Sequence, residues 1–89
     1  GRRVLVVDDN VDAAVSLATL LTLAGHQVRT VHDGTSAVVQ VGEFAPEVVL
    51  LDLGMPGMDG FETAKAVREL QHGQACCLVA LTGWGQDED

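Results

Sequence analysis

Apolar runs and segments of helical periodicity alternate along the chain. Each apolar run is rich in β-branched residues, which favour strands, and the four runs span Val4–Val7, Val28–Val31, Val48–Leu51 and Leu78–Leu81. Runs that are almost continuously apolar suit strands covered on both faces, as in a parallel sheet. The pattern therefore predicts four buried, parallel strands.

Three segments between these runs are predicted to be helices. Asn10 is suited to cap the first helix, which should stop near Gly25, a residue type that commonly follows a helix. The second begins at Asp33 and cannot continue through Pro46. The third spans Phe61–Leu70, after a stretch too rich in Gly and Pro for regular structure. The predicted apolar stripes are Ala14, Leu17, Ala18 and Leu21 in the first helix, Ala37, Val38 and Val41 in the second, and Phe61, Ala64, Val67 and Leu70 in the third.

The order of these elements predicts the fold class. A βαβαβαβ order favours an open, doubly wound parallel α/β sheet, whose right-handed crossovers place helices on both faces. With 89 residues the chain has room for one domain at most. Since it begins Gly1-Arg2-Arg3 and ends in an acidic stretch suited to a first helical turn, we expect a segment of a longer protein.

Composition argues against several classes of partner. The net charge of −8, from 13 acidic and 5 basic residues, disfavours binding to a phosphate backbone, so we expect no nucleic acid on this segment. No apolar stretch approaches the roughly 20 residues that span a bilayer, so no membrane contact is expected. The only cysteines, Cys76 and Cys77, are adjacent and point to opposite faces of a strand. This arrangement disfavours a disulfide and favours a reducing, cytoplasmic location, with both side chains filling the core.

Polar side chains follow three of the predicted strands. Asp8 and Asp9 come after the first strand, Asp52 after the third and Thr82 after the fourth. In open α/β sheets ligands bind beyond the carboxyl ends of the strands, so these groups should meet at one rim. Crowded carboxylates repel each other unless a cation lies among them, and oxygen ligands of this kind suit Mg²⁺. A His and Cys pattern for zinc is lacking.

Three motifs at these strand ends resemble a known family. The stretches VLVVDD (4–9), DLGMPGMDG (52–60) and ALTG (80–83) are similar to those of the receiver domain of two-component response regulators. The resemblance covers nearly the whole chain, 1–89, and implies a flavodoxin-like fold with strand order 2-1-3-4. The longer stretches DLGMPGMDGFE (52–62) and ALTGWGQDED (80–89) also resemble receivers attached to hybrid sensor histidine kinases.

The resemblance implies a role for each matched residue. Asp52 would accept a phosphoryl group from a phosphohistidine of a histidine kinase or a histidine phosphotransfer protein. Asp9, Asp52 and the backbone carbonyl of Gly54 would ligate Mg²⁺ directly, and Asp8 would do so through a water. Thr82 would donate a hydrogen bond to the bound phosphoryl group, so that phosphorylation switches the interactions of the domain. Such a chain is a phosphoacceptor rather than an enzyme acting alone.

The sequence also departs from the family pattern. A fifth strand carrying a lysine and the final helices are not found in this segment, and Lys65 cannot replace that lysine because it falls inside the third predicted helix. The fourth strand would then lie at an exposed sheet edge, which favours association between chains.

The same residues are compatible with other functions. The chain could be an interaction module that keeps the receiver shape without phosphorylation. A phosphatase with an aspartyl nucleophile is disfavoured, because it generally needs a second Asp where Gly54 stands. The three histidines are expected to be solvated or to cap turns, and Trp84 to make a loop or interface contact; the histidines are His26, His32 and His72.

Overall fold

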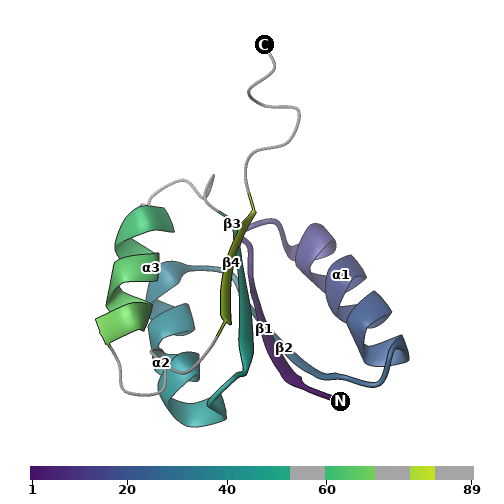
Figure 1. Ribbon diagram of the computed structural model, residues 1–89. Helices are drawn as coiled ribbons and strands as arrows, with labels where there is room; N and C mark the ends of the chain where they lie inside the picture. The colour runs from purple at the N-terminus through teal and green to yellow at the C-terminus, as the bar shows by residue number, and fades with distance from the viewer. Residues whose placement is uncertain (53–59, 70–76, 82–89) are drawn as a thin grey trace.

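The computed structural model describes residues 1–52, 60–69 and 77–81, which form four strands and three helices in the predicted order (Figure 1). The elements are β1 (Arg3–Val7), α1 (Val11–Leu23), β2 (Gln27–Val31), α2 (Gly34–Phe44), β3 (Val48–Asp52), α3 (Gly60–Glu69) and β4 (Cys77–Leu81). Each strand therefore begins and ends within one residue of its predicted limits. Leu70, predicted on the apolar stripe of the third helix, and Cys76, predicted to fill the core, lie outside the described residues.

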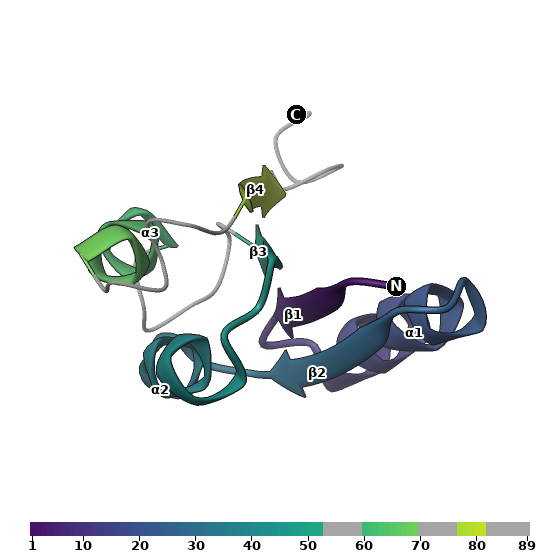
Figure 2. The ribbon, with the colours of Figure 1, turned by 60° about the horizontal axis from the view of Figure 1, so that its bottom comes forward.

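The four strands form one parallel sheet in the order β2-β1-β3-β4. This order confirms the doubly wound, flavodoxin-like prediction. Helix α1 lies on one face of the sheet, whereas α2 and α3 lie on the other (Figure 2). The chain moves outward from β1 to β2 and then returns to the opposite side of β1 as β3. The direction of winding thus reverses between β1 and β3, where ligands bind in folds of this type.

The first two helices begin after side-chain caps, at the predicted cap Asn10 and at Asp33, the predicted start of the second helix. The side chain of Asn10 accepts a hydrogen bond from the Ala13 N–H at 3.1 Å, and that of Asp33 accepts one from the Ser36 N–H at 2.7 Å. Gly25 follows α1 with a φ of 97°, a conformation that costs glycine little. The end of α2 differs from this pattern, because Ala45 adopts a left-handed conformation with a φ of 50° just before Pro46.

Two apolar clusters hold the helices to the sheet. The cluster beneath α2 and α3 contains Leu5, Val7, Val31, Ala37, Val41, Val49, Leu51 and Val67. The cluster beneath α1 contains Val4, Val6 and Ala14, with Leu17, Leu21, Val28, Val48 and Leu50 packed against it. Successive residues of a strand point to opposite faces, so β1 and β3 contribute to both clusters.

The prediction that the strands are buried on both faces was wrong for β2, whereas β4 was expected at an exposed edge and lies at the edge of the described sheet. In β2, Gln27 and Arg29 are exposed, and in β4, Cys77 is exposed and Val79 retains 38% of its accessible surface. In the described part of the chain, α1 is the sole helix on its face, and it contacts β1 and β2 but leaves β4 open. The expectation that Cys77 fills the core was therefore also wrong, and its thiol is free.

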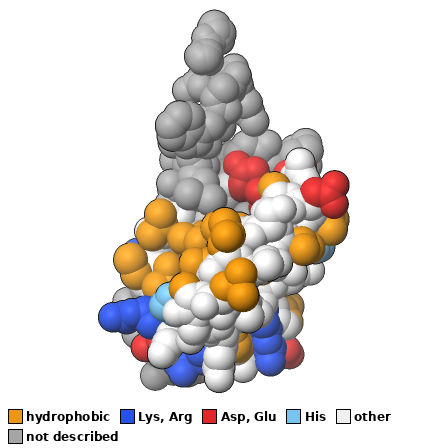
Figure 3. Space-filling model, turned by 90° about the vertical axis from the view of Figure 1, so that its right-hand side faces the viewer, with side chains coloured by type: hydrophobic (Ala, Val, Ile, Leu, Met, Phe, Trp, Pro, Cys, Tyr) orange, Lys and Arg blue, Asp and Glu red, His pale blue; other side chains and the backbone are white. Residues whose placement is uncertain are grey.

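Hydrophobic side chains also reach the surface on the side of the molecule that carries α1 (Figure 3). The exposed ones on this helix are Val11, Val15, Leu20 and Leu23. Within the described residues, no helix is both long enough and apolar enough to cross a bilayer.

Candidate functional site

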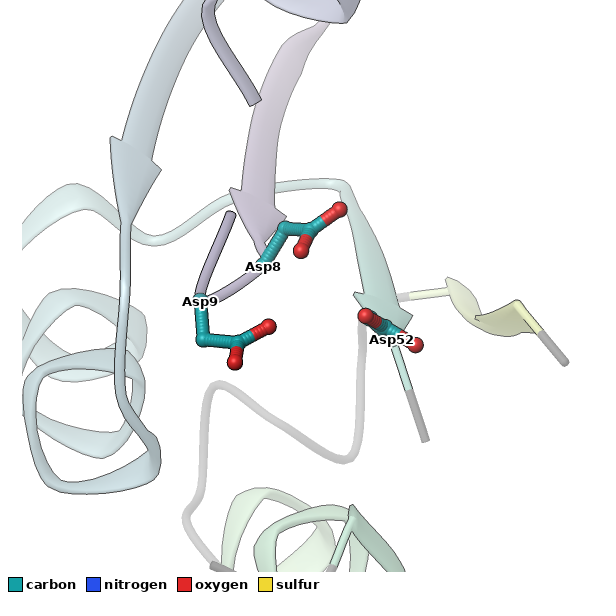
Figure 4. Close-up of side chains that lie close together, drawn as sticks. All are labelled: Asp8, Asp9 and Asp52. Atoms are coloured by element: carbon teal, nitrogen blue, oxygen red, sulfur yellow. The ribbon is translucent and has the colours of Figure 1, made fainter. Parts of the chain in front are cut away.

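An acidic cluster lies where β1 and β3 end. Asp8 and Asp9 directly follow β1, and Asp52 is the last residue of β3. The two strands pair in parallel with Val7 opposite Leu51, so the next residues, Asp8 and Asp52, lie side by side where the pairing of β1 with β3 ends. One carboxylate oxygen from each of the three side chains lies within 4.8 Å of the other two (Figure 4). The structure thus brings together the three acidic residues that the sequence singled out.

The crowding of these carboxylates changes the acidity of Asp8. Partial burial raises the pKa of the Asp8 carboxyl group above its ordinary value of 3.8, and the neighbouring Asp52 and Asp9 add to the increase. A hydrogen bond from the Asn10 backbone N–H, 2.9 Å from Asp8 Oδ1, opposes this effect. The net increase means that Asp8 holds its proton more tightly in the folded chain than in the unfolded chain.

We therefore expect Asp8→Asn to stabilise the chain at neutral pH in the absence of divalent cations. The favourable contribution of protonated Asp8 is complete below the ordinary pKa and is lost as the pH rises through the higher folded pKa. At neutral pH the ionised Asp8 therefore lowers the free energy of unfolding, and the neutral amide of Asn removes this effect. For a partly exposed charge, the free energy of unfolding should rise by about 0.5–1 kcal/mol. Urea unfolding measures it, and the gain should disappear in acid.

The matched control for this prediction is Asp12→Asn. Asp12 is an exposed acidic residue in the first turn of α1, where its charge favours the helix. Its replacement lowers the net negative charge by the same amount but relieves no crowding in the cluster. Equal stabilisation by both variants would contradict the role of the cluster and indicate a general effect of net charge.

The loop that carries Asp8 and Asp9 is also held by the end of β2. The Asp8 N–H donates to the Val31 carbonyl at 3.1 Å, and Nδ1 of the part-buried His32 lies 2.9 Å from the Asp8 carbonyl oxygen. His32 was expected to be solvated or to cap a turn, so its contact with the Asp8 carbonyl was not predicted. The available signal was its position directly after β2, at the same sheet edge as the acidic residues.

The donor set of the cluster suits a hard divalent cation. Three carboxylates match the preference of Mg²⁺ for oxygen ligands. Thiol and imidazole groups, which zinc prefers, do not belong to the cluster of described residues. The other two predicted site residues, Gly54 and Thr82, lie outside the described residues.

Comparison with known families decides what kind of domain carries this site. The family model of the response regulator receiver domain matches residues 4–89. The chain belongs to this family. Among curated relatives, the transcriptional regulatory protein PrrA of Mycobacterium leprae is 37% identical over 78 residues, which cover 88% of this chain and 34% of PrrA. The DNA-binding response regulator MtrA of the same species is 40% identical over 67 residues, covering 75% of this chain and 30% of MtrA. The receiver thus spans about a third of these relatives.

Solved structures agree with this assignment. The chemotaxis response regulator CheY4 of Vibrio cholerae has a TM-score of 0.83 and 32% identity, and the match covers 89% of this receiver and 66% of CheY4. The receiver domain of the sensor histidine kinase PA1611 of Pseudomonas aeruginosa has a TM-score of 0.87 and 27% identity, and the match covers all of this receiver and 73% of the other. The PA1611 structure holds a magnesium ion in its active-site cleft.

Proposed function

We propose that this receiver domain acts in a phosphorelay in which Asp52 accepts a phosphoryl group from a phosphohistidine of a partner protein. An Asp52 carboxylate oxygen forms the new bond to phosphorus while the bond from phosphorus to the histidine nitrogen breaks, and that nitrogen keeps the electron pair. The observation that carries the proposal is the convergence of three carboxylates within 4.8 Å at the ends of β1 and β3 in a receiver fold.

The acidic cluster is also the proposed site for Mg²⁺. Asp9 and Asp52 would bind it directly together with the Gly54 carbonyl, and Asp8 would bind it through a water. When bound, the ion offsets the negative charge of the transferring group. The raised pKa of Asp8 supports this assignment, because partial burial and, after it, repulsion from Asp52 and Asp9 disfavour the ionised carboxylate, and a cation would offset both. The magnesium ion of the PA1611 receiver supports it as well. Thr82 would donate a hydrogen bond to a phosphate oxygen.

The test is Mg²⁺-dependent labelling of the chain by a small acyl phosphate. Approximately one phosphoryl group per chain is expected, and chelation of divalent cations should prevent its transfer. The competing function, an interaction module that is never phosphorylated, predicts no label under either condition. The presence of all three carboxylates in one cluster favours the first function.

The proposed partner is a histidine kinase or a histidine phosphotransfer protein. The likeness to PA1611, a sensor histidine kinase, supports the alternative that this receiver is a regulatory segment of a hybrid kinase. PrrA and MtrA are regulators of transcription or DNA-binding proteins, but the receiver covers about a third of each. Its net charge of −8 disfavours contact with DNA by this segment. We also propose a cytoplasmic location, which the adjacent Cys76 and Cys77, poorly suited to a disulfide, support.

We also propose that chains associate through the edge of the sheet. Among the described strands, β4 pairs with β3 on one side alone, and Val79 on it is 38% exposed. An apolar edge of this kind favours pairing with a second chain. We expect light scattering to give a mass above that of the monomer, with Val79→Lys shifting it toward the monomer. A monomeric mass for the wild type in dilute solution would contradict this expectation.

A further inference from the structure

The backbone of Asp8 is held on both sides by consecutive residues at the end of β2. Its N–H donates to the Val31 carbonyl at 3.1 Å, which continues the pairing of β1 with β2 by one residue. Its carbonyl oxygen lies 2.9 Å from His32 Nδ1. The strand that forms the edge of the sheet thereby fixes the first residue of the acidic loop.

The chemistry of the carbonyl determines which ring nitrogen of His32 carries a proton. A carbonyl oxygen can only accept a hydrogen bond, so His32 Nδ1 must be the donor in this contact. The geometry therefore assigns a protonated Nδ1 to His32. His26, at the other end of β2, has the opposite arrangement, because its Nδ1 accepts a hydrogen bond from the Arg2 N–H at 3.1 Å.

The hydrogen bond from His32 acts on the peptide unit that joins Asp8 to Asp9. This unit is planar, so fixing its carbonyl oxygen also fixes the direction in which the chain continues to Asp9. The Asp8 side chain is restrained separately, because its Oδ1 accepts from the Asn10 N–H at 2.9 Å. Asn10 in turn caps α1. A continuous set of hydrogen bonds thus links the end of β2, the acidic pair and the first turn of α1.

We propose that His32 is a positioning residue that preorganises Asp8 and Asp9 for a divalent cation. The inference rests on the proposed function, in which these carboxylates bind Mg²⁺. A loop that is ordered during folding loses less conformational freedom when the cation binds, so the affinity is higher. His32 acts through the backbone and touches neither the cation nor the phosphoryl group.

The experiment measures Mg²⁺ affinity by calorimetry for His32→Ala, His32→Asn and His26→Ala. Loss of groups that orient metal ligands commonly weakens binding by about tenfold or more, and we expect about tenfold for His32→Ala. Asn carries an N–H at the place of Nδ1, so His32→Asn should stay within about twofold of the wild type. His26→Ala is the matched control and should bind as the wild type does, because His26 lies away from the cluster.

Two further measurements on the chain without metal are independent of the Mg²⁺ titration. Nitrogen NMR shifts should show a protonated Nδ1 on His32. Exchange of the Asn10 amide hydrogen should be faster in His32→Ala than in His26→Ala, because Asp8 is then less restrained. If His32→Ala does not fold, an unprotonated Nδ1 in the wild type or about tenfold weaker binding by His32→Asn would still overturn the inference.

The outcomes separate this inference from the proposed function. Wild-type binding of Mg²⁺ with unchanged affinity in His32→Ala would overturn the positioning role and leave the phosphoacceptor proposal intact. An unprotonated Nδ1 on His32 would do the same. A wild-type chain that binds no Mg²⁺ would overturn the metal site and the positioning role together.

Discussion

Asp52→Asn is expected to abolish Mg²⁺-dependent labelling by a small acyl phosphate. Asn keeps the size of the side chain but lacks the anionic oxygen that forms the bond to phosphorus. Asp52 is the last residue of β3 and its backbone pairs with Leu81, so the substitution leaves the sheet contacts in place. The label is measured by intact mass, and we expect its amount to fall at least about a hundredfold.

The control for this experiment is Asp12→Asn, which changes the net charge by the same amount. Asp12 lies in the first turn of α1, outside the acidic cluster, and its replacement should leave the label near the wild-type level. Asp52→Asn should also unfold at a urea concentration no lower than the wild type, since it removes one of three crowded carboxylates. Labelling of Asp52→Asn at the wild-type level would place the acceptor on another residue.

Of the substitutions proposed for this chain, Leu51→Ala is expected to lower the free energy of unfolding the most. Leu51 is completely buried in the cluster beneath α2 and α3, directly before the proposed acceptor. Truncating such a side chain removes apolar contacts and leaves a cavity, at a cost of about 3 kcal/mol in the free energy of unfolding. Denaturant unfolding followed by circular dichroism measures this loss.

Leu50→Ala is the matched control, because the same side chain is shortened one residue earlier in β3. Leu50 points to the opposite face and is partly buried beneath α1. Its truncation removes less buried surface, so the loss should be about half as large or less. Equal losses for the two variants would contradict the observed division of the core between the two faces.

The fold was largely predictable because its signals are local in the sequence. Apolar runs located the strands, and Asn10, Asp33 and Pro46 located helix ends, since each acts on the backbone within a few residues. The acidic site was predictable for a related reason. Parallel strands deliver their carboxyl ends to one edge, so Asp8 and Asp52 had to emerge close together once β1 and β3 were neighbours.

The features that were missed depend on contacts between distant segments. The bond between His32 and Asp8 exists because β2 pairs with β1 in a particular register, which a single sequence does not reveal. Thr63 was not among the predicted stripe of α3, yet it is completely buried. A hydroxyl at that position carries no apolar signal. The exposure of Cys77 likewise depends on which elements cover β4, and not on the composition of the strand.

The division of the acidic cluster between two strands couples ligand binding to folding. Asp9 and Asp52 are far apart in the chain and meet only after β1 and β3 have paired across the centre of the sheet. An unfolded or half-assembled chain therefore has no equivalent chelating pocket. Any cation held there is a selective ligand of the native state, and its concentration in the surroundings contributes to the stability of the fold.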